Sequence, residues 1–196
     1  MSGNIFVVAA PSGAGKSTLV RALQQKDLNI DISISHTTRT KRDSETDGVD
    51  YHFIDKSSFE QMLSSNQFIE HANVYGNFYG TSIGSIQKII DAKRDVVLEI
   101  DWQGAYQVKK IFPNAILIYI LPPSLEILKQ RLISRGTDDK ATIEKRFAQA
   151  TDDISHAKNF DFAIVNDNFN VALHELCCII QVYRLRADKV LENFST

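Results

Sequence analysis

The chain has 196 residues, a formal net charge of −2 and a hydrophobic fraction of 43%. This length suits one α/β domain with inserted lobes, and the hydrophobic fraction is that of an ordinary globular core. The near-neutral charge excludes a global basic field, so we expect no nucleic-acid partner and only a local anion site. We find no signal peptide and no apolar run of about 18 residues, and therefore expect no membrane association. Adjacent Cys177 and Cys178 lack zinc-ligand spacing, which favours reduced, core-type cysteines and a cytoplasmic location.

The N-terminal segment joins a short apolar run, Ile5–Ala9, to a loop of small residues and a Lys-Ser pair. The run predicts a buried strand, and the spacing that follows predicts a helix over 17–26. Strand, glycine-bearing loop, Lys-Ser and helix form the architecture of a P-loop. Its backbone N–H groups bind phosphate, Lys16 adds a mobile cation, and the Ser17 hydroxyl is a ligand for Mg²⁺. The loop residues expected to bind ATP are Ala10, Pro11, Ser12, Gly13, Ala14, Gly15, Lys16, Ser17 and Thr18.

Ala10 stands where the literal P-loop pattern begins with glycine. We expect alanine to be tolerated there because the backbone should keep a negative φ.

The rest of the chain alternates strand and helix patterns. Strands are predicted at 28–35, 95–101, 115–121 and 162–166, with a hairpin over 68–82. Helices are predicted at 57–66, 82–93, 104–112, 125–135, 141–158 and 169–192. Trp102, the single tryptophan, is interpreted as a packing residue.

Arg39, Lys41 and Arg42 place three cations within four residues. Most such runs are solvated loops, but the rigid fork of arginine donors also suits phosphate, and the Tyr51 hydroxyl can join them. Composition alone leaves a solvated loop and an anion clamp about equal.

Three carboxylates in strand patterns are candidates for ligand contacts. Glu70 either faces solvent, the commoner case, or accepts two N–H donors from a planar ligand such as the edge of guanine. Glu99 and Asp101 end an apolar strand, where an acidic residue in P-loop proteins orients hydrated Mg²⁺. Either of them could do so, or could contact the second substrate.

Basic residues also mark the helices predicted at 125–135 and 141–158. Arg131 and Arg135 share a face, and Lys145 and Arg146 lie on the second helix. These are either surface charges or parts of a mobile lid that brings Arg135 and Arg146 onto transferring phosphate and excludes water. Asn166 and Asp167 follow a strand, at the end where open α/β sheets bind ligands.

Together these motifs resemble the guanylate kinase family of nucleoside-monophosphate kinases over nearly the whole chain. The resemblance rests on the loop at 11–17, on Arg131-Leu132-x-x-Arg135-Gly136 and on Val165-Asn166-Asp167. A more specific block consists of Thr37, Thr38, Arg39, Arg42, Glu45, Gly48, Tyr51 and Phe53. A P-loop alone specifies only a nucleoside triphosphate, whereas the second block indicates GMP as the acceptor.

The resemblance implies an α/β fold, a single guanylate kinase-like domain with a P-loop parallel-sheet core flanked by helices. The core would comprise 1–33, 96–124 and 160–196, with an inserted GMP-binding lobe at 34–95 and a helical lid at 125–159.

The resemblance also implies roles for individual residues. Lys16, Arg42, Arg135 and Arg146 would be catalytic, Ser17 would bind the metal, and Arg131, Asn166 and Asp167 would join the loop in binding ATP. The implied GMP-binding residues are Ser35, Arg39, Arg42, Tyr51, Glu70, Tyr79, Thr81, Glu99 and Asp101. The histidines match no catalytic position.

The implied reaction is phosphorylation of GMP, and of dGMP, to GDP by ATP, through direct in-line transfer with Mg²⁺ as cofactor, in purine nucleotide metabolism. The implied partners are the small molecules GMP and ATP, and the sequence leaves open whether the chain forms a homo-oligomer.

Two other functions share parts of this pattern. One is a catalytically silent guanylate-kinase-like binding module, against which the presence of Lys16, Arg39 and the other arginines argues. The other is a related P-loop kinase with a different phosphorylated acceptor, against which Tyr51, Glu70 and Tyr79 argue together.

Overall fold

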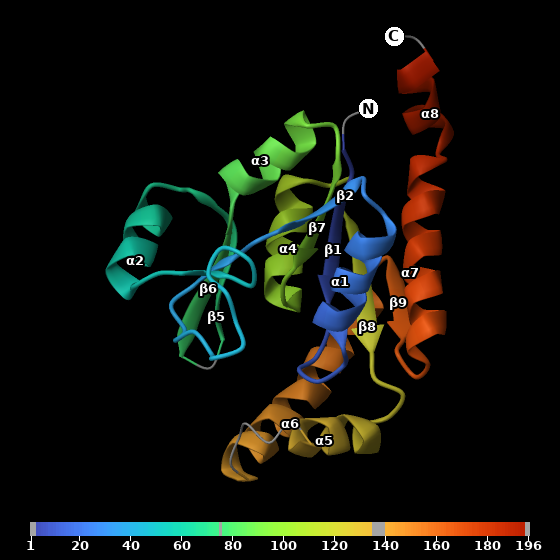
Figure 1. Ribbon diagram of the computed structural model, residues 1–196. Coiled ribbons are helices and arrows are strands. Elements are labelled where there is room, and N and C mark those ends of the chain that lie inside the picture. The colour runs from blue at the N-terminus through green and yellow to red at the C-terminus, as the bar shows by residue number, and fades with distance from the viewer. Residues whose placement is uncertain (1–2, 75, 135–139, 195–196) are drawn as a thin grey trace.

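A computed structural model describes residues 3–74, 76–134 and 140–194. Its centre is a parallel five-stranded sheet with the order β2-β7-β1-β8-β9. The strands are β1 (Ile5–Ala9), β2 (Ile30–Ser33), β7 (Asp95–Glu99), β8 (Ile116–Leu121) and β9 (Phe162–Val165). Helices α1 (Lys16–Lys26) and α7 (Phe169–Arg184) cover one face, and α4 (Trp102–Ile111) covers the other (Figure 1). The predicted fold class, a P-loop parallel sheet flanked by helices, is confirmed.

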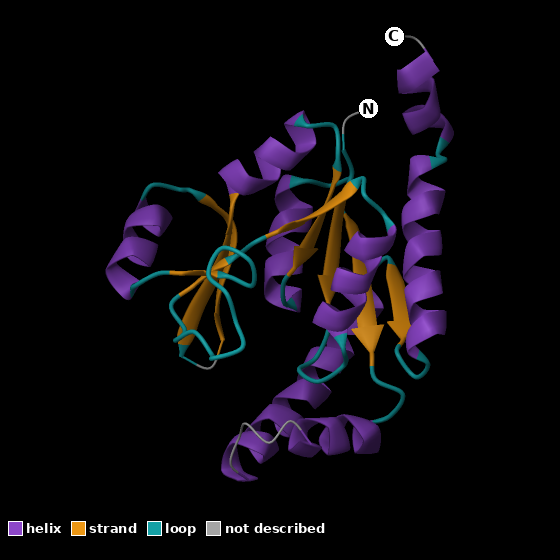
Figure 2. Ribbon diagram, in the orientation of Figure 1, coloured by secondary structure: helices purple, strands orange, loops and turns teal. Residues whose placement is uncertain are grey.

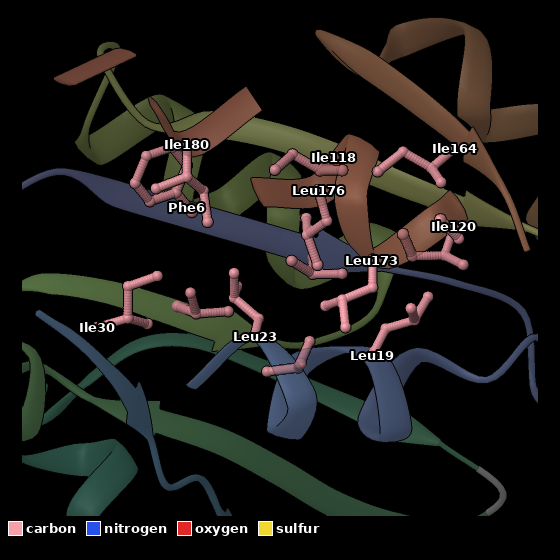
Figure 3. Packing of buried hydrophobic residues seen from close by; sticks show 14 of the residues in the cluster. Phe6, Leu19, Leu23, Ile30, Ile118, Ile120, Ile164, Leu173, Leu176 and Ile180 are labelled. Atoms are coloured by element: carbon pink, nitrogen blue, oxygen red, sulfur yellow. The ribbon is translucent and has the colours of Figure 1, made fainter. Parts of the chain in front are cut away.

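The core sheet is buried on both faces because helices cover both. Phe6 and Val8 of β1 point into one apolar cluster with α1 and α7, whereas Val7 points into another with α4. Figure 3 shows the first cluster, in which Leu19 and Leu23 of α1 meet side chains of the sheet and α7. Burial of each such large apolar side chain contributes roughly 1.5–3 kcal/mol. This packing fixes α1, and therefore the loop before it, against the sheet.

A second, four-stranded sheet lies to one side of the core (Figure 2). It has the order β4-β3-β6-β5 and is formed by β3 (His36–Thr37), β4 (His52–Phe53), β5 (Phe68–Val74) and β6 (Asn77–Ser82). Helix α2 (Lys56–Ser64) packs on it through Phe59, whose ring stacks on Phe68 with centroids 4.5 Å apart. We call these strands, their loops and α2 the small-sheet lobe. The chain returns to the core through α3 (Ile83–Asp91).

Helices α5 (Leu125–Ser134) and α6 (Lys140–Ser155) form a pair at the carboxyl ends of the core strands, next to the loop that precedes α1 (Figure 1). Leu128, Leu132 and Ala150 give the pair a small apolar cluster of its own. A Cβ atom at Gly13 would lie 3.1 Å from Leu128 and 3.3 Å from Leu132, so α5 packs directly on the loop.

Two neighbouring elements have other bounds than predicted. The strand predicted at 95–101 ends earlier, at Glu99, and the helix predicted from 104 begins earlier, at Trp102. Both differences follow from Asp101, which caps α4 by accepting the Gly104 N–H on its Oδ1 at 2.8 Å. The helix predicted at 141–158 likewise ends at Ser155 and continues as a 3₁₀ turn, η1 (His156–Asn159).

The prediction of one helix over 169–192 is wrong. Helix α7 ends at Arg184, and a separate helix, α8 (Ala187–Phe194), extends beyond the core sheet (Figure 1). The fully buried positions of α7 end at Ile180, and its last contacts with the core are made by Tyr183 and Arg184, directly before the helix ends. The expectation that both cysteines are core residues also fails in part, since Cys178 is exposed and Cys177 only partly buried.

Candidate active site

The loop between β1 and α1 takes a conformation that exposes its backbone donors. Gly13 and Gly15 have φ values of 93° and 90°, which glycine adopts without strain. Gly15 precedes α1 and no side chain caps the helix, so the N–H groups of its first turn are available for an anion. Ala10 is not among the residues with positive φ, as expected.

Asn166 braces the loop from the end of β9. Its buried side-chain amide donates to the Ala14 carbonyl at 2.8 Å, and Arg131 of α5 donates to the Asn166 carbonyl at 3.1 Å. A Cβ atom on Gly15 would lie 2.4 Å from Asn166 Nδ2, so a side chain at this position would displace the Asn166 amide. Asp167 follows at the same strand end and is exposed. Of the residues predicted at the ATP side, Asn166 therefore contacts the loop directly and Arg131 contacts Asn166.

The carboxyl end of β7 lies against the Lys-Ser pair. Lys16 Nζ donates to the Ile100 carbonyl at 2.9 Å, and the Ser17 hydroxyl donates to Glu99 Oε1. Asp101, the alternative carboxylate, has its Oδ1 engaged as the cap of α4. Of the two acids left open by the sequence, Glu99 is thus the one in contact with Ser17.

A cavity of about 440 Å³ opens beside this end of α1. Its lining consists of Ser17, Thr18, Arg21, Ala22, Gln25 and Phe169. Thr18, predicted to bind ATP, therefore lines a hollow along the side of α1.

Glu70 of β5 is only 3% exposed, so the more common interpretation, a solvent-facing strand residue, is wrong. Its Oε1 accepts a 2.5 Å hydrogen bond from the Thr81 hydroxyl, which lies 2.9 Å from the Ser35 hydroxyl. Burial raises the pKa of Glu70 to about 7, and the charge of Asp101 acts in the same direction while the Thr81 donor opposes it. Ser35, Glu70 and Thr81 thus form one hydrogen-bonded group.

Gly104 is a site residue that the sequence did not single out. A Cβ atom there would lie 2.5 Å from Glu70 Oε2, so the carboxylate approaches the backbone of α4 where a side chain is missing. A glycine near the start of a helical pattern is the sole local signal, and it does not indicate which residue fills the space.

The aromatic and basic residues of the small-sheet lobe also gather. The Arg39 guanidinium lies 5.6 Å from the ring centres of both Tyr51 and Phe53, and the Tyr51 and Tyr79 rings are 5.8 Å apart. Burial raises the pKa of Tyr51 to about 12, so its hydroxyl remains a neutral donor. For Arg39 the solvated-loop alternative is therefore wrong, while the Arg42 side chain is 48% exposed.

Glu45 organises this cationic loop, although the sequence assigned it no role beyond its place in the family block. Its Oε1 accepts from Arg39 Nη2 at 2.7 Å, and its Oε2 accepts the Arg42 backbone N–H at 2.8 Å. The carboxylate thereby sets the spacing between the two arginines.

Two predicted catalytic arginines remain. Arg146 is partly buried on α6, and Arg135 lies outside the described residues. An ion pair between Arg21 of α1 and Asp50 joins the helix that follows the phosphate loop to the small-sheet lobe.

In the part of the chain that the structure describes, no group of three His, Cys, Asp or Glu could hold a metal, and no helix could span a membrane.

A parallel sheet whose first strand leads through a glycine loop into a Lys-Ser helix N-terminus defines a P-loop nucleotide-binding protein. Comparison with known proteins narrows the class. The family model for guanylate kinase matches residues 2–183. This chain belongs to the guanylate kinase family and is a kinase.

Individual relatives agree with the family match. A guanylate kinase from Thiobacillus denitrificans is 52% identical over 191 residues, covering 97% of this chain and 91% of its own length. One from Chromohalobacter salexigens is 50% identical over 188 residues, covering 96% and 87%. The crystal structure of guanylate kinase from Anaplasma phagocytophilum superimposes with a TM-score of 0.80 at 32% identity, covering 95% of this chain and 88% of that one.

Proposed function

We propose that this chain transfers the γ-phosphoryl group of ATP to GMP, giving ADP and GDP, and that it accepts dGMP as well. The observation that carries the choice of acceptor is the buried Glu70, held by Thr81 near the phosphate loop. A buried carboxylate with an oxygen left for a ligand suits a planar edge carrying two N–H donors. Guanine offers N1–H and an exocyclic amine on one edge, and adenine does not.

The small-sheet lobe, within 34–95, is the proposed GMP site. Ser35 and Thr81 orient Glu70, and Asp101 approaches the same edge from the cap of α4. Arg39, Tyr51 and Tyr79 hold the acceptor phosphate, with Arg42 at the rim. The Arg39 guanidinium is already held by the Tyr51 ring and the Glu45 carboxylate, so its side chain loses little conformational entropy when it binds phosphate.

The phosphate loop is the proposed ATP site. Backbone N–H groups from Gly13 to Ser17 surround the phosphates, and Lys16 exchanges its contact with the Ile100 carbonyl for a phosphate oxygen. Arg131, Asn166 and Asp167 lie toward the adenine end, where Asn166 also keeps the loop in shape.

The residues beside Lys16 fit Mg²⁺. The Ser17 hydroxyl and the Glu99 carboxylate are hard oxygen donors in contact with each other, and Mg²⁺ is bound by one or two such groups together with phosphates and waters. We propose that Ser17 holds the ion and Glu99 orients its water shell. The ion would neutralise charge on the transferring phosphate.

The transfer itself needs no strong general base. An oxygen of the GMP phosphate attacks the γ-phosphorus while the bond to the β-bridging oxygen breaks, and that electron pair leaves with ADP. The obstacle is repulsion between two polyanions, which Lys16, Arg42, Arg135 and Arg146 offset. We propose that 125–159 acts as a lid on a core formed by 1–33, 96–124 and 160–196, in a cytoplasmic protein.

The test is ADP formation from ATP and Mg²⁺ with GMP, AMP, CMP or UMP as acceptor. We expect rapid turnover with GMP alone. Turnover with another nucleotide would contradict the assignment of Glu70. No turnover with any of them, while GMP still binds, would support the silent binding module instead.

A further inference from the structure

The Trp102 cluster lies where α6 meets the core, and none of its members is a residue assigned to either nucleotide. It consists of Trp102 and Tyr106 of α4, Tyr119 of β8, Asp153 of α6 and His156 of η1. The Trp102 indole and the His156 imidazole are stacked, with ring centroids 3.5 Å apart and planes inclined by 9°.

Hydrogen bonds from two core elements fix the end of α6 in this cluster. Trp102 Nε1 donates to Asp153 Oδ1 at 3.0 Å, and the Tyr119 hydroxyl donates to the Asp153 backbone carbonyl at 2.7 Å. The Tyr106 hydroxyl lies 3.2 Å from His156 Nδ1 and accepts from Asn159 at 2.8 Å. Asp153 is therefore held through both its side chain and its backbone carbonyl, and apolar packing alone does not need such directional bonds.

The cluster is connected to the phosphate loop through the chain itself. Trp102 directly follows Asp101, which caps α4. Ile100, one residue earlier, accepts a 2.9 Å hydrogen bond from Lys16 Nζ on its backbone carbonyl. The short segment 100–102, which joins β7 to α4, therefore contacts Lys16 through Ile100 and α6 through Trp102.

Helical phase connects Asp153 to Arg146. The two residues are seven positions apart in the continuous helix α6. Seven residues of an α-helix fall about 20° short of two turns and span roughly 10 Å. Asp153 and Arg146 therefore share a face, and the bond that sets the rotation of α6 at Asp153 also sets the direction of Arg146.

We propose that Trp102 and Asp153 are positioning residues that hold α6 so that Arg146 reaches the transferring phosphate. The inference rests on the proposed function, because it assigns Arg146 to the transition state. Trp102 thus has a role beyond the packing that the sequence suggested.

The decisive experiment is a double-mutant cycle on kcat for GMP phosphorylation. Asp153→Ala removes the acceptor of the indole N–H and keeps the backbone carbonyl bonded to Tyr119. We expect kcat to fall about tenfold or more while the KM for GMP stays within about twofold. In an Arg146→Ala background the same change should lower kcat by less than about twofold, because the residue through which it acts is gone.

Three further variants separate positioning from stability. Asp152→Ala removes an exposed carboxylate from the neighbouring position and should leave kcat unchanged. Asp153→Asn retains an oxygen acceptor and should restore most of kcat. Trp102→Phe retains a ring over His156 but lacks the N–H donor, so its kcat should fall as in Asp153→Ala. If urea titration shows that Asp153→Ala does not fold, the kcat of Trp102→Phe decides whether the inference holds.

Fluorescence gives a second readout, because Trp102 is the single tryptophan of the sequence. Loss of the carboxylate at Nε1 should shift the emission maximum in Asp153→Ala and not in Asp152→Ala. Two results would overturn this inference without touching the proposed function. One is that Asp153→Ala lowers kcat by the same factor in the parent and in the Arg146→Ala background. The other is that the kcat of Trp102→Phe stays within about twofold of the parent. A parent protein that does not phosphorylate GMP would overturn the proposed function and this inference with it.

Discussion

Glu70 Oε2 occupies the space that a side chain on Gly104 would need, with only 2.5 Å from the oxygen to the position of the missing Cβ atom. The carboxylate on β5 and the glycine on α4 are 34 positions apart, and the fold brings them into contact where the small-sheet lobe meets the core.

We expect Gly104→Ala to raise the KM for GMP by about tenfold or more, because the methyl group displaces the carboxylate from Thr81. The KM for ATP should not change. The control is Gly84→Ala in α3, where a Cβ atom meets nothing within 4 Å, and where alanine should stabilise the helix by up to about 1 kcal/mol. Steady-state kinetics on both variants checks this, and equal effects on the two substrates would contradict it.

Glu70 should make the ligand-free protein less stable as pH rises. Its folded pKa of about 7 is above its ordinary value of 4.5. Between these values the folded protein retains a proton that the unfolded chain has released. The stabilisation is therefore complete below 4.5 and is lost as pH rises through 7. The slope should be on the order of 1 kcal/mol per pH unit within this window.

Glu70→Gln provides the comparison, because the amide oxygen still accepts from Thr81 and does not titrate. Urea unfolding of both proteins from pH 4.5 to 8 should give a difference in unfolding free energy that changes with pH within the window and levels off above it. Parallel curves would show that Glu70 does not carry the raised pKa.

Glu45→Ala should weaken GMP binding through the two arginines it holds. Without the carboxylate, Arg39 loses its 2.7 Å partner and the Arg42 N–H its 2.8 Å acceptor. We expect the KM for GMP to rise about tenfold, the effect of roughly one charge-assisted hydrogen bond. Glu60→Ala, which breaks the exposed pair with Lys56, should have no effect on the same assay. A larger change in the KM for ATP than for GMP would argue against this role.

Gly15→Ala should lower the free energy of unfolding by more than backbone strain alone explains. Its φ of 90° disfavours any side chain, and its Cβ atom would lie 2.4 Å from Asn166 Nδ2. Gly76→Ala isolates the strain, because Gly76 has a φ of 81° and open space around it. Urea unfolding should show a loss of about 1 kcal/mol for Gly76→Ala and more for Gly15→Ala. Only Gly15→Ala should also raise the KM for ATP.

Arg146→Ala should lower kcat far more than it weakens GMP binding, on the order of 10³-fold for an arginine that acts on transferring phosphate. Lys145→Ala, an exposed cation next to it on α6, should leave kcat close to that of the parent. Pre-steady-state and steady-state rates with saturating ATP and GMP provide the measurement. An unchanged kcat with a raised KM would remove Arg146 from the transition state.

Local patterns predicted most of the fold. Helices and strands followed from apolar spacing, and the departures have two kinds of cause. The earlier start of α4 is local, because Asp101 accepts the N–H of Gly104 three residues along the chain. The division of the last helix is tertiary, because the contacts of α7 with the core end at Tyr183 and Arg184. This second cause is not visible in a window of a few residues, because it depends on what the helix packs against.

The phosphate loop could be recognised from the amino-acid sequence alone, since anion binding there needs small residues, a lysine and a helix start within one short contiguous stretch. The residues of the guanylate kinase block could be recognised by their spacing in the same way. The fold was needed to show that Glu70 is buried, that Glu99 rather than Asp101 contacts Ser17, and that Trp102 holds α6 through Asp153. These contacts join residues between 11 and 82 positions apart, whose distance in space is set by the packing of the whole chain.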